Sequence, residues 1–159
     1  EVIKAYIHRG GSVFLVGLGW TWTKYIDKDI DQYPLNQVAN DFGIFFTANF
    51  IGGNDAGPII HGRTMMNTEH PITKGVTWVS TDKGANAGTF RIVDPAVPII
   101  WGDEQTHRTN GLQRPPVVVA AEVPGGGRLV GIQHPDYVLN HLDDTILVEN
   151  IVHWLVHLP

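Results

Sequence analysis

Apolar residues recur along this chain at two spacings, and together they predict an alternation of helices and strands. Residues 2–7 carry apolar side chains at helical spacing, and Gly10-Gly11 marks the end of that helix. An apolar, β-branched run over 12–17 then predicts a strand buried on both faces, as strands of parallel sheets are. In such sheets, binding and catalytic groups gather at the turn after the strand, here residues 17–19.

The rest of the chain carries further patterns of this kind. A short amphipathic helix is predicted over 35–42, with Gly43 closing it, and a last helix follows Asp143-Asp144. We expect one face of that last helix to be buried, formed by Ile146, Leu147, Ile151, Trp154 and Leu155. Strands are predicted over 44–47, 59–64, 89–93, 97–101, 117–123 and 128–133, the last two as a hairpin. Residues 49–57 and 102–115 predict loops, and an exposed turn is expected after His134.

Helices that alternate with strands define the α/β class. We predict a flavodoxin-like, mostly parallel sheet flanked by helices, with a C-terminal β-hairpin and a closing helix. Domains of this class usually open with a strand, whereas this chain opens with a helix. The pattern therefore indicates that a first βα unit is lacking or is supplied by a partner segment. Because it has neither internal repeats nor a linker, 1–159 is predicted to be one domain, taken from a larger chain.

Composition narrows the functions that such a domain could have. The 159 residues carry a formal net charge of -5, and Lys and Arg do not cluster, which argues against a nucleic-acid surface. No apolar run reaches the roughly 18–20 residues that cross a bilayer, so no membrane span is expected. The absence of cysteine excludes disulfides, zinc sites with sulfur ligands and a thiol nucleophile.

Four stretches give the chain a resemblance to a known superfamily. They are the strand ending at residues 17–19, the phrase His-Pro-Ile-Thr-Lys-Gly-Val at 70–76, the glycine-led strand over 126–132 and the helix at 150–155. Together they resemble the class I glutamine-amidotransferase-like domains, which implies the flavodoxin-like sheet described above.

A finer resemblance rests on residues 18–22, 33–36 and 42–44. They are most similar to the amidotransferase-like domain that accompanies enhancin-like metallopeptidase domains, as in TRP-channel-associated factors. The His-Glu-x-x-His zinc motif of the neighbouring peptidase is absent from this chain, so no protease activity is implied.

The resemblance implies a site that has lost its nucleophile. Working amidotransferases place a cysteine on the turn after a central strand and a His-x-Glu pair at a later strand end. Residues 133–136 are similar to that pair, which implies His134 as general base and Asp136 as the group that orients its ring. The aligned turn carries Leu18, which has no nucleophilic atom, so we interpret the pair as a relict. The catalytic alternative is that water, or a threonine such as Thr21, serves as the nucleophile.

Aromatic residues just past the first strand indicate a binding surface. Stacking on their rings would suit a glycan or a peptide side chain, whereas the competing interpretation is that the tryptophans are core anchors. The candidate ligand-binding residues are Gly17, Leu18, Gly19, Trp20, Thr21, Trp22 and Tyr137.

Two patterns resemble metal sites but lack essential ligands. Alternating carboxylates over 27–31 resemble the start of a calcium loop, but Gln32 and Val38 stand where a glycine and a glutamate are needed. His153 and His157 lie four residues apart on a helix that packs through other side chains. We therefore predict no metal site and no cofactor.

Three functions remain compatible with the sequence. The leading hypothesis is a non-catalytic amidotransferase-like module that binds or scaffolds, with other domains or chains of its parent protein, a glycan or a peptide as partners. The second is a hydrolase that uses His134 and Asp136, and the third is a structural subunit whose sheet edge pairs with another chain. The finer resemblance, together with the glycine, asparagine and tryptophan content, favours an extracellular or cell-envelope setting.

Overall fold

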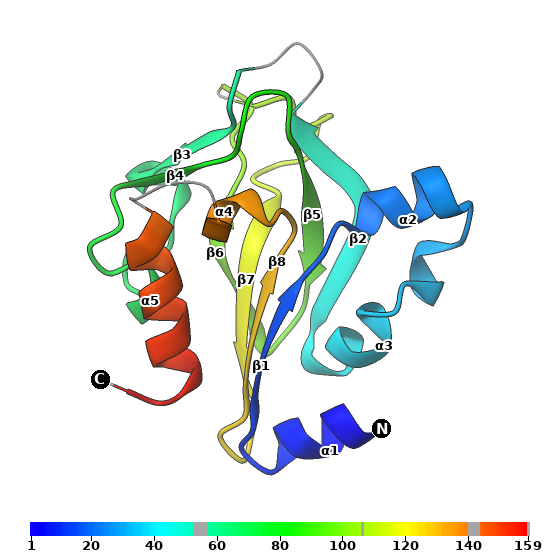
Figure 1. The fold of residues 1–159 in the computed structure, drawn as a ribbon, viewed down its shortest axis with the longest axis vertical. Helices are drawn as coiled ribbons and strands as arrows, with labels where there is room; N and C mark the ends of the chain where they lie inside the picture. The colour runs from blue at the N-terminus through cyan, green and yellow to red at the C-terminus, as the bar shows by residue number, and fades with distance from the viewer. Residues whose placement is uncertain (53–56, 106, 140–143, 159) are drawn as a thin grey trace.

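The computed structural model describes residues 1–52, 57–105, 107–139 and 144–158, and its centre is a mixed sheet of four strands (Figure 1). The strands lie in the order β1 (Ser12–Val16), β8 (Arg128–Ile132), β7 (Pro116–Glu122) and β6 (Ala96–Trp101). β1 is parallel to β8, whereas β7 is antiparallel to both of its neighbours. The chain is therefore an α/β protein, as predicted.

The expectation of a mostly parallel sheet was wrong, because only the pair of β1 and β8 runs parallel in the main sheet. β7 and β8 are joined by the short turn at 123–127, and parallel strands need a crossover of a dozen residues or more. The predicted hairpin is thus confirmed. It makes most of this sheet antiparallel, and the flavodoxin-like arrangement is not confirmed.

Two antiparallel ribbons flank the main sheet. β2 (Ile44–Gly52) pairs with β5 (Asn86–Ile92), and β3 (Ile60–Gly62) pairs with β4 (Trp78–Ser80). β5 contacts β7, so the longer ribbon lies against the middle of the main sheet. The strand predicted over 44–47 extends further than expected, and β4 was not predicted.

The helices are α1 (Val2–His8), α2 (Gly19–Ile26), α3 (Asn36–Ala39), α4 (Asp136–Leu139) and α5 (Asp144–Leu155), with 3₁₀ turns at Ile30–Gln32, Asn40–Phe42, Arg63–Met65 and Pro71–Thr73. In Figure 1, α5 lies on one side of the main sheet and α2 and α3 lie on the other. The helix predicted over 35–42 is confirmed as α3 and the 3₁₀ turn after it. Gly43 closes it in the left-handed region (φ 78°), where a side chain would meet the Val93 carbonyl oxygen.

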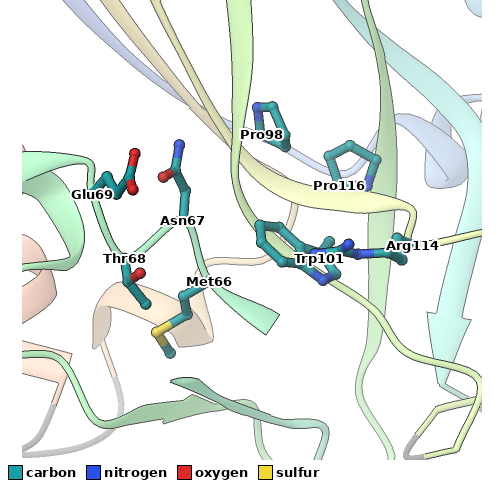
Figure 2. A pocket seen from close by; sticks show the side chains of 8 residues that line it. All are labelled: Met66, Asn67, Thr68, Glu69, Pro98, Trp101, Arg114 and Pro116. Atoms are coloured by element: carbon teal, nitrogen blue, oxygen red, sulfur yellow. The ribbon is translucent and has the colours of Figure 1, made fainter. Parts of the chain in front are cut away.

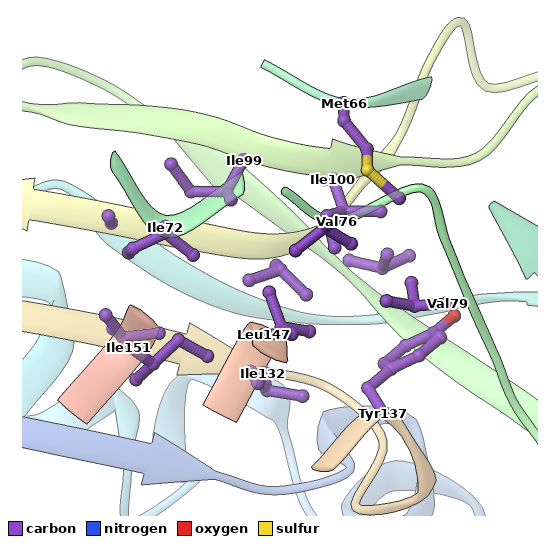
Figure 3. Packing of buried hydrophobic residues seen from close by; sticks show 14 of the residues in the cluster. Met66, Ile72, Val76, Val79, Ile99, Ile100, Ile132, Tyr137, Leu147 and Ile151 are labelled. Atoms are coloured by element: carbon purple, nitrogen blue, oxygen red, sulfur yellow. The ribbon is translucent and has the colours of Figure 1, made fainter. Parts of the chain in front are cut away.

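Two apolar clusters form the core, one on each face of the main sheet. Successive side chains of a strand point to opposite faces, so Val118 belongs to one cluster and Val119 to the other. The first cluster packs Leu147 and Ile151 of α5 against the sheet (Figure 3). The second cluster lies toward α3 and β2 and includes Phe46.

Three expectations about burial were wrong. β1 is an edge strand with one neighbour, so Phe14 and Val16 are 36% and 39% exposed instead of buried. Ile146 is 41% exposed, because α5 turns its other apolar residues to the core. The expected exposed turn after His134 is the short helix α4, whose Tyr137 is fully buried. Asp143, the expected cap of the last helix, lies outside the described residues.

Candidate functional site

The two segments that carry the predicted site residues lie side by side at the carboxyl ends of β1 and β8. Val16 stands opposite Ile132, and the Gly17 amide donates a hydrogen bond to the Ile132 carbonyl oxygen at 3.0 Å. After β1 the chain turns into α2, with Leu18 as the residue before the helix. This strand–turn–helix unit is the setting that a nucleophile would need, and it lies beside Gln133, the residue after β8.

Gln133 fills the space between these strand ends, a role that the sequence analysis missed. Its side chain is fully buried: Oε1 accepts a hydrogen bond from the Gly19 amide at 2.9 Å, and Nε2 donates to the Thr89 carbonyl oxygen. The Gln133 backbone oxygen accepts from the Gly88 amide at 2.9 Å, and a side chain at Gly88 would overlap Gln133. The junction of α2, β5 and β8 is therefore packed and hydrogen-bonded. One signal in the sequence could have indicated this role. An amide side chain directly follows an apolar strand, and an amide that is buried there needs hydrogen-bond partners.

His134 and Asp136 contact each other, but not in the way that a catalytic pair does. Nδ1 of His134 lies 3.3 Å from Asp136 Oδ1 and accepts a hydrogen bond from the Asp136 backbone amide at 3.2 Å. A catalytic carboxylate accepts a hydrogen from Nδ1, whereas a ring nitrogen that accepts carries none. Asp136 Oδ2 instead accepts from the Asp82 amide at 3.0 Å. The pair therefore acts as a local turn that fastens the start of α4 to residue 82.

The charge of His134 is set mainly by burial. Desolvation lowers the pKa of His134 below its usual 6.5, and the nearby carboxylates of Asp136 and Asp82 only oppose this effect. The ring is therefore neutral at pH 7. A neutral imidazole could accept a proton, but it needs a nucleophile to take it from.

The threonines of α2 hold their hydroxyl hydrogens within the helix. Thr21 Oγ1 donates to the Leu18 carbonyl oxygen at 2.7 Å, and Thr23 Oγ1 donates to the Trp20 carbonyl oxygen at 3.0 Å. A substitute nucleophile would donate its hydrogen to a base instead. Together with Leu18 on the turn, this arrangement gives no support to covalent catalysis at α2.

The two tryptophans of the predicted binding surface are fastened to the backbone of other segments. Trp20 is 8% exposed and its indole N–H donates to the Asn86 carbonyl oxygen at 3.0 Å, while its ring packs on Phe50 at 5.1 Å. The Trp22 indole N–H donates to the Asp29 carbonyl oxygen at 3.1 Å. These contacts are those of side chains that hold α2 against β2, β5 and the loop after α2.

Tyr137 lies in a different part of the molecule from these tryptophans. Its ring is fully buried, and its hydroxyl lies 2.7 Å from Nε2 of the buried His61. His61 Nδ1 lies 2.9 Å from the Trp101 carbonyl oxygen, so Nδ1 donates and Nε2 accepts from the tyrosine hydroxyl. His107 also contacts the His61 ring. Tyr137 is therefore a core residue in a buried polar chain.

Neither a metal-binding cluster nor a membrane-spanning helix is present in residues 1–52, 57–105, 107–139 and 144–158. Among those residues, no group of three or more histidine or carboxylate side chains could hold a metal ion. The helices that the structure describes are too short or too polar to cross a bilayer.

Solved structures with a similar fold include two that each match 97% of this chain. One is the N-terminal domain of mmIFT52, with a TM-score of 0.73 and 14% identity over 97% of this chain and 68% of that chain. The other is a ThuA-like protein from Bacteroides uniformis, with a TM-score of 0.58 and 14% identity over 97% of this chain and 62% of that chain. No protein-family model and no curated protein sequence matches the chain. At this level of identity, the likenesses define the fold alone.

These neighbours correct the finer resemblance seen in the sequence. The ThuA-like protein fits a glutamine-amidotransferase-like fold, so the likeness concerns the type of fold and not membership of the superfamily. The predicted link to domains that accompany enhancin-like metallopeptidases was wrong, because the neighbours are the IFT52 domain and a ThuA-like protein and show no connection with enhancin. The misleading signal was the set of short stretches at 18–22, 33–36 and 42–44, in which Trp20 and Trp22 make contacts that hold α2 in place.

Proposed function

We propose that this chain is a non-enzymatic structural domain that joins an assembly through the open edge of its main sheet. The observation that carries the proposal is β1, an edge strand whose five residues, Ser-Val-Phe-Leu-Val, include no charge and no proline. Its register with β8 is continuous, without a bulge. Edge strands of monomeric proteins usually carry a charged residue, a proline or a bulge, because these features discourage pairing with other chains.

The opposite edge of the same sheet is protected in the usual ways. β6 contains Pro98, and its register with β7 shifts on both sides of Ile100. The outer side of β6 is also covered, since Met66 bridges Ile100 and the Asn67 amide donates to the Ile99 carbonyl oxygen at 2.9 Å. One edge is thus closed within the chain, whereas β1 presents an unprotected one.

The open edge offers both backbone and apolar groups. The Gly17 amide bonds to β8, and hydrogen-bonding direction alternates along a strand, so the amides of Phe14 and Val16 point away from β8. The side chains of these two residues are also partly exposed. A second copy of the chain supplies a matching strand, because two β1 edges can pair antiparallel across a two-fold axis.

Two further observations support a structural role. The strand-end site has no nucleophile on its turn, and hydrogen bonds within the protein engage the side chains of Gln133 and Thr21 and Nδ1 of His134. One solved neighbour, with a TM-score of 0.73, is the N-terminal domain of mmIFT52, and this likeness suggests assembly with other subunits.

A single introduced cysteine tests the edge directly, because the chain has none of its own. In an antiparallel pair of β1 strands centred on Phe14, the two Phe14 Cα atoms would lie about 5.5 Å apart, a distance that a disulfide spans. We expect Phe14→Cys to form a covalent dimer rapidly under mild oxidation. We also expect the mass of the unmodified chain, measured by sedimentation, to rise with concentration.

Val97→Cys is the matched control, since Val97 lies on the protected edge strand and is 39% exposed. This variant should stay monomeric under the same oxidation. The proposal is wrong if the two variants cross-link equally, or if the unmodified chain keeps the mass of a monomer at every concentration.

A further inference from the structure

A cavity of about 430 Å³ lies at the end of the main sheet away from β1. This volume is within the range of roughly 300–1,000 Å³ that small-molecule sites occupy. Figure 2 shows the residues that line it: Met66, Asn67, Thr68, Glu69, Pro98, Trp101, Arg114 and Pro116. None of them belongs to the strand-end site or to β1, so this cavity lies at the covered β6 edge and is separate from the open edge at β1.

The floor and the rim of the cavity differ in chemistry. Met66 and Trp101 are nearly buried, at 4% and 8% exposure, and with Pro98 and Pro116 they offer apolar surface. Polar side chains from 67–69 lie on one side of the cavity, and Arg114 lies on the other (Figure 2). An apolar floor with a few placed polar groups is the usual constitution of a small-ligand site.

Arg114 occupies an unfavourable backbone conformation. Its φ is 45°, in the left-handed region that residues other than glycine, asparagine and aspartate rarely adopt. It also precedes Pro115, and the residue before a proline is normally extended. Strained residues of this kind cluster at ligand sites, where the strain fixes a group in place.

The strained backbone holds the Arg114 guanidinium over the face of the Trp101 ring, 4.1 Å from its centre. Stacking orients the flat guanidinium, and its N–H groups then form a planar fork that matches a carboxylate. Glu69 lies across the cavity from Arg114 (Figure 2), and among the described residues no ion pair joins these two side chains. The lining carries one positive and one negative side chain, which suits an anion with a single charge better than a phosphate.

We propose that this cavity binds a carboxylate carried on an apolar body. The carboxylate would form a two-point hydrogen bond with Arg114, and the apolar body would lie on Met66, Pro98 and Trp101. Two sources supply this chemistry: a small free acid, and the C-terminus of a peptide whose last side chain is apolar.

The first experiment uses 3-phenylpropionate as the probe and its neutral amide, 3-phenylpropionamide, as the control ligand. Binding is followed by NMR through the indole N–H signals of the five tryptophans, with Trp101→Phe used to assign the Trp101 signal. We expect the acid to shift the Trp101 signal in a saturable way. The amide lacks the charged hydrogen bonds, so its affinity should be lower by about tenfold or more.

Variants of Arg114 separate a bound carboxylate from simple apolar adsorption. Arg114→Gln should weaken binding of the acid by about tenfold or more. Arg114→Lys keeps the charge but loses the planar fork, so its affinity should lie between those of Arg114→Gln and the unmodified chain. Arg108→Gln is the matched control, because Arg108 is an exposed arginine of the same loop that does not line this cavity. Backbone amide spectra confirm that each variant is folded.

A peptide ending in phenylalanine, as free acid and as C-terminal amide, distinguishes the two sources. Binding of the free-acid peptide in the same Arg114-dependent way identifies a peptide C-terminus as a ligand. Binding of 3-phenylpropionate alone identifies a small acid. The proposal is overturned if neither acid shifts Trp101, or if the acid binds Arg114→Gln as tightly as the unmodified chain.

Discussion

Burial decides the protonation state of His61. Desolvation, followed by the neighbouring His107, lowers the pKa of His61 from 6.5 to about 3, although the bond to the Trp101 carbonyl oxygen opposes this. The unfolded chain would take up this proton as the pH falls through about 6.5, while the folded chain would not do so until about pH 3. The stability that the neutral ring provides is therefore complete above about pH 6.5 and is lost progressively below it.

A pH series of urea unfolding checks this expectation. Between about pH 6 and about pH 4, His61 should lower the free energy of unfolding by up to ~1.4 kcal/mol per pH unit. His61→Asn keeps a donor for the Trp101 carbonyl oxygen and removes the titrating ring. The variant should be less stable at pH 7, but its stability should fall less steeply with acid. If the two proteins lose stability in parallel as the pH falls, folding does not lower the pKa of His61.

The strain at Arg114 can be measured without its side chain. Arg114→Ala and Arg114→Gly both remove the contact with Trp101, but only glycine adopts φ 45° without a steric cost. We expect the glycine variant to be more stable than the alanine variant by about 1 kcal/mol in thermal or urea unfolding. The same pair at Arg108, whose φ is not positive, should favour alanine, because glycine leaves the unfolded chain with more conformations to lose. Equal stability of the two Arg114 variants would show that the backbone at position 114 is not strained.

Single residues show where sequence reasoning stops. Gly43 could be predicted as a helix end, because its left-handed conformation is a local property of glycine. Arg114 has the same sign of φ, but an arginine carries no local signal for it. Gln133 was also missed, since its partners Gly19 and Gly88 lie far away in the sequence. Leu18, by contrast, excludes a nucleophile by its chemistry alone.

At the scale of elements, α5 tests how the buried face of a helix is chosen. Helical spacing places both Ile146 and Leu147 near an apolar stripe, but Leu147 is fully buried and Ile146 is 41% exposed. The side chain of Asn150 favours this rotation of the helix, because it donates to the carbonyl oxygens of Ile72 and Lys74. Such a contact between distant segments is not visible in the periodicity.

Truncation of the two neighbours should therefore have unequal effects. Leu147→Ala leaves a cavity in the first apolar cluster and should lower the free energy of unfolding by about 2–5 kcal/mol. Ile146→Ala should lower it by less than about 1 kcal/mol. Both values follow from urea unfolding at neutral pH, and similar losses would mean that α5 is rotated from the position described.

The helix α2 shows the opposite limitation, because its own sequence did not predict it. Residues 19–26 are rich in aromatic and β-branched side chains, which favour strands over helices. Contacts from other elements stabilise it, among them the bonds of Gly19 to Gln133 and of Trp20 to Asn86. Tertiary context thus overrides local preference at the very turn where the sequence predicted a site.

At the scale of the whole molecule, the sequence predicted most elements but not the direction of the sheet. Alternating helices and apolar strands favour a parallel sheet, and that expectation holds for β1 and β8 alone. Strand direction depends on which segments pair, and the closing hairpin places β7 antiparallel between β8 and β6. The same pairing leaves β1 at an edge, which is the feature that the proposed function uses.

Hydrogen exchange measures that edge in the free and assembled chain. In dilute solution, the amides of Phe14 and Val16 should exchange faster than the amide of Leu15, which points to β8, while the amides of the central strand β7 exchange slowly. If β1 pairs with a second copy, raising the concentration should slow Phe14 and Val16 and leave Leu15 unchanged. Slow exchange of Phe14 and Val16 in the dilute chain would mean that the edge is already covered, and the assembly surface would then have to lie elsewhere.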